Sequence, residues 1–110
     1  MHALAREHCN PLPAGARPLP PADWPPLLAQ LNGAWQIVDG HHLTRSWRLA
    51  DFAQALALVN RIGALAEAQD HHPDLVLRWG RVELTLWTHA VGGLSRNDFI
   101  LAAHIDRLAP

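Results

Sequence analysis

A chain of 110 residues, 49% of them apolar, can bury one hydrophobic core and is too apolar to be disordered along its whole length. Nine basic and ten acidic residues nearly cancel without forming runs, so neither nucleic-acid nor membrane-surface binding is expected. The sequence offers no apolar stretch of about 20 residues, no signal peptide and only one cysteine, Cys9, which predicts a cytoplasmic protein without internal disulfides.

The first 21 residues are rich in Pro, Ala and Gly and lack any helical or strand period. Residues 1–21 are therefore predicted to form a flexible, loosely docked arm, and residues 22–110 one domain. This domain begins with a short helix that has Asp23 near its N-cap, prolines in its first turn and Asn32-Gly33 after its end. The residues of this helix expected in the core are Leu27, Leu28 and Leu31.

A β-hairpin and a long helix are predicted next. Asp39-Gly40 is a strong two-residue turn signal between an alternating segment around Trp35 and a return strand over 43–49. Asp51 is a suitable N-cap for a helix that continues to about Gln69. Its apolar residues recur at helical spacing and are expected to lie on the sheet: Phe52, Ala55, Leu56, Val59, Ile62 and Ala66.

A second hairpin and a last helix complete the pattern. The strands are predicted over 75–79 and from Val82 to about His89, joined at Gly80-Arg81. The run Ser95 to Asp98 fits a capping box and starts a helix that ends near Leu108. The order α-β-β-α-β-β-α predicts an α+β fold, a four-stranded antiparallel sheet covered by helices on one face.

Histidine is the unusual residue of this sequence, with eight in the chain. His71-His72-Pro73 follows the long helix, and His89 lies near the end of the last predicted strand. Imidazole can give or take a proton near neutral pH, which makes these three histidines candidates for acid/base work. His71 and His72 should diverge in an extended segment, so they are expected on two sides of a flat ligand, not paired on one metal ion.

The spaced set Glu67, His71-His72-Pro73, Trp79, His89 and Asp98 resembles the pterin-4a-carbinolamine dehydratase family, over about Trp35 to Asp106. The resemblance implies a hydro-lyase that removes water from 4a-hydroxytetrahydropterin and yields quinonoid dihydropterin, recycling the cofactor of aromatic amino-acid hydroxylases. It implies no cofactor and no metal for the enzyme itself. It also implies a homodimer or homotetramer, with a hydroxylase as a candidate partner.

The resemblance further implies roles for individual residues. His72 and His89 are expected to be the acid/base pair, with His71 orienting the substrate or sharing the proton transfer. Glu67 is expected to hydrogen-bond an imidazole or the pterin edge, and Asp98 to support the pocket from behind while capping the last helix. The residues expected to receive the ring are Pro73, Thr88, Ala90 and Val91.

Two other classes of function stay open at this point. A non-catalytic partner of a hydroxylase or of a transcription factor is compatible with the same fold, because fold alone does not establish turnover. A metal-dependent hydrolase is the competing enzyme class, although His8-Cys9 supplies too few ligands for a zinc site. The sequence leaves the natural pterin unassigned.

Overall fold

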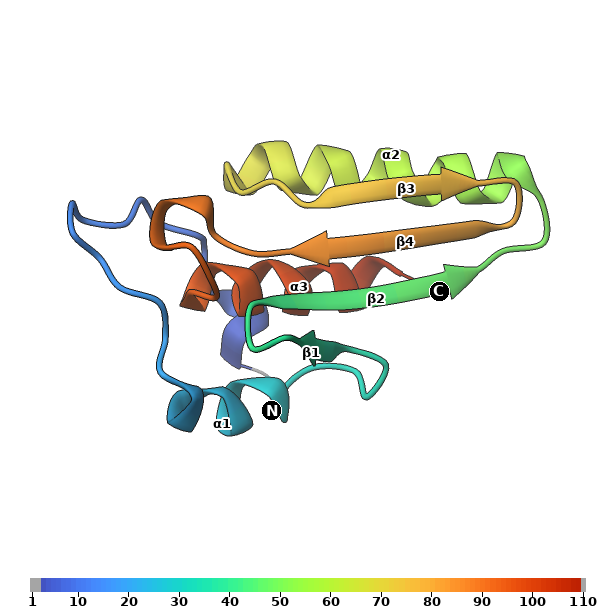
Figure 1. Cartoon of the computed structure of the whole chain (residues 1–110). Coiled ribbons are helices and arrows are strands. Elements are labelled where there is room, and N and C mark those ends of the chain that lie inside the picture. The colour runs from blue at the N-terminus through green and yellow to red at the C-terminus, as the bar shows by residue number, and fades with distance from the viewer. Residues whose placement is uncertain (1–2, 110) are drawn as a thin grey trace.

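The computed structural model describes residues 3–109 and confirms the α+β fold, with an antiparallel four-stranded sheet in the order β1-β2-β4-β3 (Figure 1). The strands are β1 (Gln36–Val38), β2 (His42–Arg48), β3 (Asp74–Arg78) and β4 (Arg81–Leu86). The helices are α1 (Trp24–Leu28), α2 (Phe52–Gln69) and α3 (Arg96–Leu108), with 3-10 helices η1 (Ala3–Arg6), η2 (Pro21–Asp23) and η3 (His89–Val91). No helix within residues 3–109 is long and apolar enough to span a bilayer.

One face of the sheet is buried against α2 and α3, as the alternating pattern predicts. Val82, Leu84 and Leu86 of β4 are fully buried, and so is Leu43 of β2. Figure 1 shows both long helices behind the sheet, with β1 at one edge and β3 at the other. Burying each of these side chains contributes about 1.5–3 kcal/mol, so this face supplies much of the driving force for folding.

The core-facing side of β2 also carries a charge, which the sequence analysis did not single out. Arg45 is only 9% exposed, and its guanidinium lies over the rings of Trp47 and Trp35, at 4.7 and 5.8 Å from the ring centroids. Asp106 of α3 pairs with it at 2.5 Å and also accepts the indole N–H of Trp35 at 2.7 Å. The buried cation is therefore neutralised by a single carboxylate from another element.

The first hairpin has the predicted turn with one additional residue. Asp39 and Gly40 both take positive φ, 55° and 61°, as a turn matching the strand twist requires. Val38 pairs with His42, so His41 also belongs to the loop.

Helix α2 begins and ends where predicted, but its buried face differs. The Asp51 carboxylate accepts the amide of Gln54 at 2.9 Å, which confirms the cap. The buried residues are Ala55, Leu58, Ile62, Ala66 and Gln69. The prediction was wrong for Phe52 and Leu56, which are 45% and 39% exposed. The helix has two adjacent apolar rows, and only packing decides which row meets the sheet.

The C-terminus of α2 turns the chain sharply toward the histidines. Asp70 adopts a left-handed conformation with φ of 50°. The His71 amide donates to the Ala66 carbonyl at 3.2 Å and the Asp70 amide to the Glu67 carbonyl at 3.3 Å. These two bonds form a Schellman motif, which ends the helix and brings His71 and His72 out of it.

The second hairpin differs from its prediction at both ends. Arg78 pairs with Arg81, so the turn is Trp79-Gly80 and not Gly80-Arg81. Strand β4 ends at Leu86, before the predicted His89. The chain folds back because the Thr88 amide donates to the Gly93 carbonyl at 2.8 Å, which leaves His89 at the start of η3.

The N-terminal segment contributes to the core. Leu4 of η1 is fully buried, and η1 packs against α3. The Leu4 amide donates to the side-chain oxygen of Gln30 at 3.1 Å. The flexibility expected for residues 1–21 stays a prediction. Within that segment Leu4 and Ala5 of η1 lie in the core, and Cys9 and Leu19 pack against it.

Candidate active site

The candidate site is organised around Asp98, which is fully buried in the first turn of α3. Its Oδ2 accepts the amide N–H of Ser95 at 2.8 Å, as the capping box predicts, and the hydroxyl of Thr88 at 2.8 Å. Its Oδ1 lies 2.6 Å from Nε2 of His71. One carboxylate thus joins the start of α3, the segment after β4 and the segment after α2.

The direction of each hydrogen bond in this network follows from its chemistry. The Thr88 hydroxyl donates its only proton to Asp98. The Ser95 hydroxyl must therefore be the donor in its 2.7 Å contact with Thr88. The carboxylate therefore receives a hydroxyl and an amide on Oδ2 and keeps Oδ1 for His71. All these groups except His71 are at least nine-tenths buried, so the network is rigid and shielded from water.

His71 is held in one tautomer by this arrangement. A carboxylate only accepts, so Nε2 of His71 carries the proton that Asp98 receives. In the neutral ring, Nδ1 is then the nitrogen with a free lone pair. The side chain of His71 is 12% exposed, so it is largely buried yet reachable.

His72 lies in a more open position and contacts a different carboxylate. Its Nε2 is hydrogen-bonded to Glu67. An imidazole was one of the two partners predicted for Glu67, the pterin edge being the other. The His72 side chain is 53% exposed and that of Glu67 79%, so water screens this pair. The two neighbouring imidazoles therefore differ in burial and in partner, as their divergent directions predict.

His89 is exposed and stacks on an aromatic ring. Its ring centroid lies 3.7 Å from that of Trp87, with an interplanar angle of 30°. His41 packs on the same indole, with a centroid separation of 4.4 Å. Trp87 thus restrains His89 at the start of η3, next to Thr88 of the buried network.

A cavity of about 190 Å³ lies beside His71. Of the predicted site residues, His71, Thr88 and Ala90 line it, so the turn around His89 and the end of α2 meet there. The predicted residues that are not among the lining are Glu67, His72, Pro73, His89, Val91 and Asp98. The structure thus brings three of the predicted site residues to one cavity. His72 and His89 are the chain neighbours of two of them, His71 and Thr88.

Several residues of this cavity were missed from the sequence. Gln69, Asp70 and Asn97 line it, together with residues 9–12 of the N-terminal segment. The only sequence signal for Gln69, Asp70 and Asn97 was that they lie within two positions of His71 or next to Asp98. The N-terminal residues gave no signal, because a proline-rich segment without periodicity is also what a mobile arm looks like.

Cys9 is the cavity residue with a perturbed proton affinity. Burial raises the pKa of its thiol to about 11 from 9.0, and the Asp98 carboxylate adds to the rise. The thiol also lies 3.4 Å from the Asn97 carbonyl. The folded protein therefore keeps Cys9 protonated at physiological pH.

We expect Cys9 to react with a disulfide reagent about 100-fold more slowly in the folded protein at pH 8 than in denaturant, because its thiolate fraction is lower. Since the unfolded thiol ionises first, its contribution to stability is present below pH 9.0 and is lost as the pH rises to about 11. Thiol release measured by absorbance checks the rate, and equal rates in both states would contradict the expectation. Urea unfolding of Cys9→Ser, which lacks this titration, is the control for the pH dependence.

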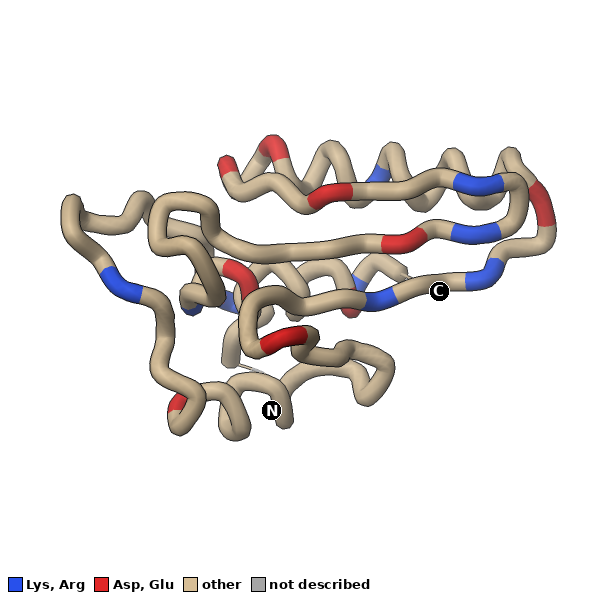
Figure 2. The backbone as a smooth tube through the Cα atoms, in the orientation of Figure 1, with Lys and Arg blue, Asp and Glu red and all other residues tan. Residues whose placement is uncertain are grey.

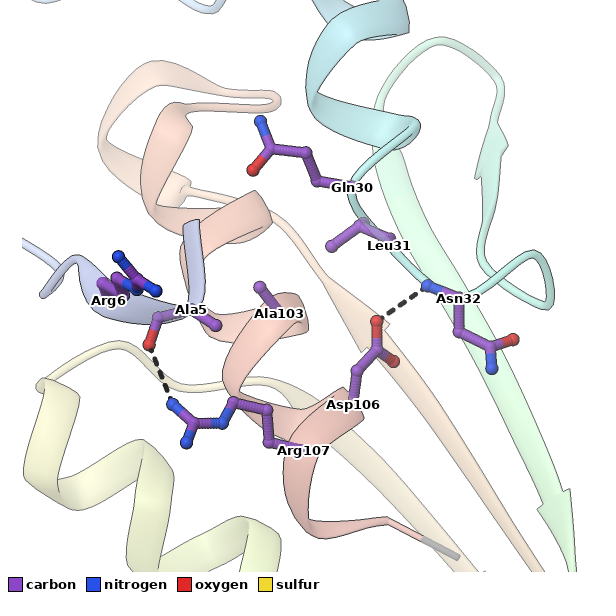
Figure 3. Close-up of a pocket in the computed structure, with 8 residues that line it drawn as sticks. All are labelled: Ala5, Arg6, Gln30, Leu31, Asn32, Ala103, Asp106 and Arg107. Carbon is purple, nitrogen blue, oxygen red and sulfur yellow. Dashed lines mark hydrogen bonds between the residues drawn. The ribbon is translucent and has the colours of Figure 1, made fainter. Parts of the chain in front are cut away.

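A larger hollow of about 500 Å³ lies between η1, the end of α1 and α3 (Figure 3). Its carboxylate, Asp106, is already bonded to Arg45 and to the amide of Asn32, the latter at 2.8 Å. Arg107 reaches across it toward the carbonyl of Ala5, at 3.4 Å. No histidine is among its lining residues, so the smaller cavity is the better candidate for proton-transfer chemistry.

Figure 2 shows acidic and basic residues interspersed over the elements. Arg48, Arg81 and Arg78 face one another across the sheet at the opposite end of β3 and β4 from the histidines, where Glu83 bridges Arg78 and Arg81 at 3.1 and 3.5 Å. Within residues 3–109, no group of three or more His, Cys, Asp or Glu side chains is arranged to hold a metal ion.

Known proteins with similar sequences identify the family of this chain. The model of the family described as pterin 4 alpha carbinolamine dehydratase matches residues 17–108. The chain belongs to this family. A relative from Rubrobacter xylanophilus named as a pterin-4-alpha-carbinolamine dehydratase is 48% identical over 108 residues, covering 98% of this chain and all of its own. One from Alkaliphilus metalliredigens with the same name is 41% identical over 97% of this chain and 96% of its own.

Solved structures place the fold in the same family. A transcriptional coactivator/pterin dehydratase from Brucella melitensis superposes with a TM-score of 0.78 at 32% identity, covering 86% of this chain and 100% of its own. A pterin dehydratase-like RuBisCO assembly factor of the alpha-carboxysome gives a TM-score of 0.60 at 24% identity, over 71% and 92%, and shows the fold alone. The match to the Rubrobacter relative extends well beyond the predicted Trp35 to Asp106 and includes most of the N-terminal segment.

Proposed function

We propose that this protein dehydrates a 4a-hydroxytetrahydropterin to quinonoid dihydropterin by histidine general acid/base catalysis. In this reaction a base removes the proton on ring nitrogen N5, the C4a–O bond breaks, and an acid protonates the departing hydroxyl to give water. A C4a=N5 double bond forms in its place. Family membership supports the substrate class. His71 lines the cavity, and His72 and His89 in the adjoining segments supply further imidazoles for a reaction that needs two proton transfers and no nucleophile.

The observation that carries the proposal is the contact of His71 with the buried Asp98. Asp98 holds the proton of His71 on Nε2, which leaves Nδ1 as the basic nitrogen and stabilises the imidazolium that forms when N5 is deprotonated. We therefore propose His71 as the base. The resemblance alone implied that His71 orients the substrate or shares the proton transfer, and the Asp98 contact is the reason for proposing it as the base.

His72 and His89 are proposed as the source of the acid. Both are exposed enough to exchange protons with water, which regenerates the acid after each turnover. Glu67 orients the ring of His72 through their hydrogen bond, and the stacked Trp87 restrains the ring of His89. Positioned proton transfer is worth about 10²–10⁴ in rate, which suffices for a carbinolamine that also loses water unaided.

The test is stopped-flow absorbance of enzymatically generated 4a-carbinolamine. Wild-type protein should accelerate its decay, and His71→Ala should return the rate to within about tenfold of background. His42→Ala removes an imidazole outside the cavity and is the matched control. EDTA should leave the rate unchanged, and a rate lost on chelation would favour the metal-dependent alternative. A well-folded wild type without any effect would leave only a non-catalytic role as an interaction partner.

We also propose that the chain self-associates in solution. Phe52 and Leu56 on α2 and Val76 on the edge strand β3 are 39–45% exposed, and Trp79 is 69% exposed. Apolar side chains on a helix face and beside an unpaired strand edge are suited to contact with a second copy.

Replacing Leu56 by aspartate should shift the protein toward monomer, since a carboxylate at a closed apolar interface has no partner. Sedimentation velocity measures the change, and Ala14→Asp, at an exposed position outside α2 and β3, is the control. An unchanged distribution for both Leu56→Asp and Val76→Asp would argue against these surfaces.

A further inference from the structure

The N-terminal segment 7–12, here called the strap, runs along one side of the His71 cavity. In Figure 1 it is part of the blue trace at the left, beside the turn after β4. Cys9, Asn10, Pro11 and Leu12 all line the cavity, opposite residues of α2, α3 and the Thr88 segment. The strap therefore supplies one wall of the candidate pterin site.

Two buried amides hold the backbone of the strap. Oε1 of Gln69 accepts the Cys9 amide at 2.8 Å. The Asn97 side chain accepts the Asn10 amide at 3.1 Å and donates to the Asn10 carbonyl at 2.7 Å. With the strap in place, Gln69 and Asn97 are only 8% and 9% exposed, so these hydrogen bonds lie where little water competes for them.

The beginning of the strap is fastened outside the cavity. The Glu7 carboxylate makes a two-pronged ion pair with Arg96 at 2.6 and 2.9 Å, and the Arg96 guanidinium lowers the pKa of Glu7. Nε2 of His104 donates to the Glu7 carbonyl at 2.7 Å. Anchors at both Glu7 and Asn10 fix the position from which Pro11 and Leu12 reach the cavity.

We infer that the strap determines which pterins the site accepts, with Leu12 as the specificity-determining side chain. This inference rests on the proposed function. Nδ1 of His71 is available to the hydrogen-bonding edge of a pterin, while Pro11 and Leu12 offer apolar surface to its ring or its 6-substituent. Ligand pockets usually have volumes of at least roughly 300 Å³. The His71 cavity, at about 190 Å³, is smaller, so a larger or smaller side chain in its lining should change which ligands fit.

The experiment compares Leu12→Trp and Leu12→Ala with Ala14→Trp, which adds the same indole at an exposed position of the same segment. Initial rates are measured with 4a-carbinolamines of 6-methyltetrahydropterin and of tetrahydrobiopterin, which has a longer 6-substituent. Binding of 7,8-dihydrobiopterin is measured by calorimetry. Circular dichroism and urea unfolding establish that each variant folds.

For Leu12→Trp we expect KM to rise at least about tenfold and dihydrobiopterin to bind correspondingly more weakly, with kcat within about twofold of wild type. Leu12→Ala should change the kcat/KM ratio between the two substrates by about threefold or more. Ala14→Trp should match wild type in every measurement. If both Leu12 variants match Ala14→Trp while wild type is active, the strap inference is overturned and the proposed function stands. If wild type neither binds nor dehydrates either pterin, both are overturned.

Discussion

Replacing Asp98 by asparagine is expected to lower kcat about 10- to 100-fold while costing only about 1–2 kcal/mol of stability. The asparagine oxygen can still accept from Ser95 and Thr88, so the start of α3 remains capped. Its amide nitrogen would then face Nε2 of His71 and donate to it, which moves the ring proton to Nδ1. The nitrogen proposed as the base would be occupied by a proton.

The measurement is the pH dependence of kcat by stopped flow, together with urea unfolding. Ser95→Ala is the matched control, because it removes the hydroxyl that donates to Thr88 but leaves the bond from Asp98 to His71. It should cost about 1 kcal/mol of stability and retain wild-type turnover. If Ser95→Ala and Asp98→Asn lose turnover in proportion to stability, Asp98 has a structural role only and the tautomer argument is wrong.

Replacing Asp106 by alanine is expected to destabilise the protein by about 3–5 kcal/mol, a large part of the stability of a domain this size. The reason is the buried Arg45, which would keep its charge between Trp35 and Trp47 and lose the carboxylate at 2.5 Å. The Trp35 indole N–H would lose its acceptor as well. Urea unfolding monitored by tryptophan fluorescence measures the change.

Two comparisons separate the buried charge from the loss of a surface ion pair. Glu83→Ala breaks the exposed pairs with Arg78 and Arg81 and should cost less than about 1 kcal/mol. The double variant Arg45→Met, Asp106→Leu should recover at least about 2 kcal/mol relative to Asp106→Ala, because it removes the unpaired cation. A double variant no more stable than Asp106→Ala would show that the cation is not the source of the loss.

Local signals in the sequence were sufficient for most of the fold. Asp51 predicts the start of α2, Asp39-Gly40 the first turn, and Ser95 to Asp98 the start of α3, because each depends on hydrogen bonds or dihedral angles within a few residues. The predictions were wrong where contacts with residues distant in the sequence determine the end of a strand or the buried face of a helix. The bridge from Thr88 to Gly93 ended β4 before His89, and the position of the sheet selected Leu58 over Leu56 for the core.

The candidate site shows the same division. The spacing of Glu67, His71, His72, His89 and Asp98 was sufficient to recognise the family, which the comparisons confirm. Contacts between these residues could not be read from spacing, since His71 meets Asp98 and His72 meets Glu67 only after the Schellman turn has directed the two rings apart. The strap could not be predicted from the sequence because its anchors are single side chains on other elements: Gln69, Arg96, Asn97 and His104.

By itself, the sequence determined the α+β element order, the family and the types of residue available for proton transfer, because these follow from local periodicity, capping and a specific motif. Only the tertiary structure decided that Asp98 orients His71, that Asp106 neutralises a buried Arg45, and that the N-terminal segment walls the cavity. These three features join residues 27 to 88 positions apart in the chain, and such pairings are set by the packing of the core around them.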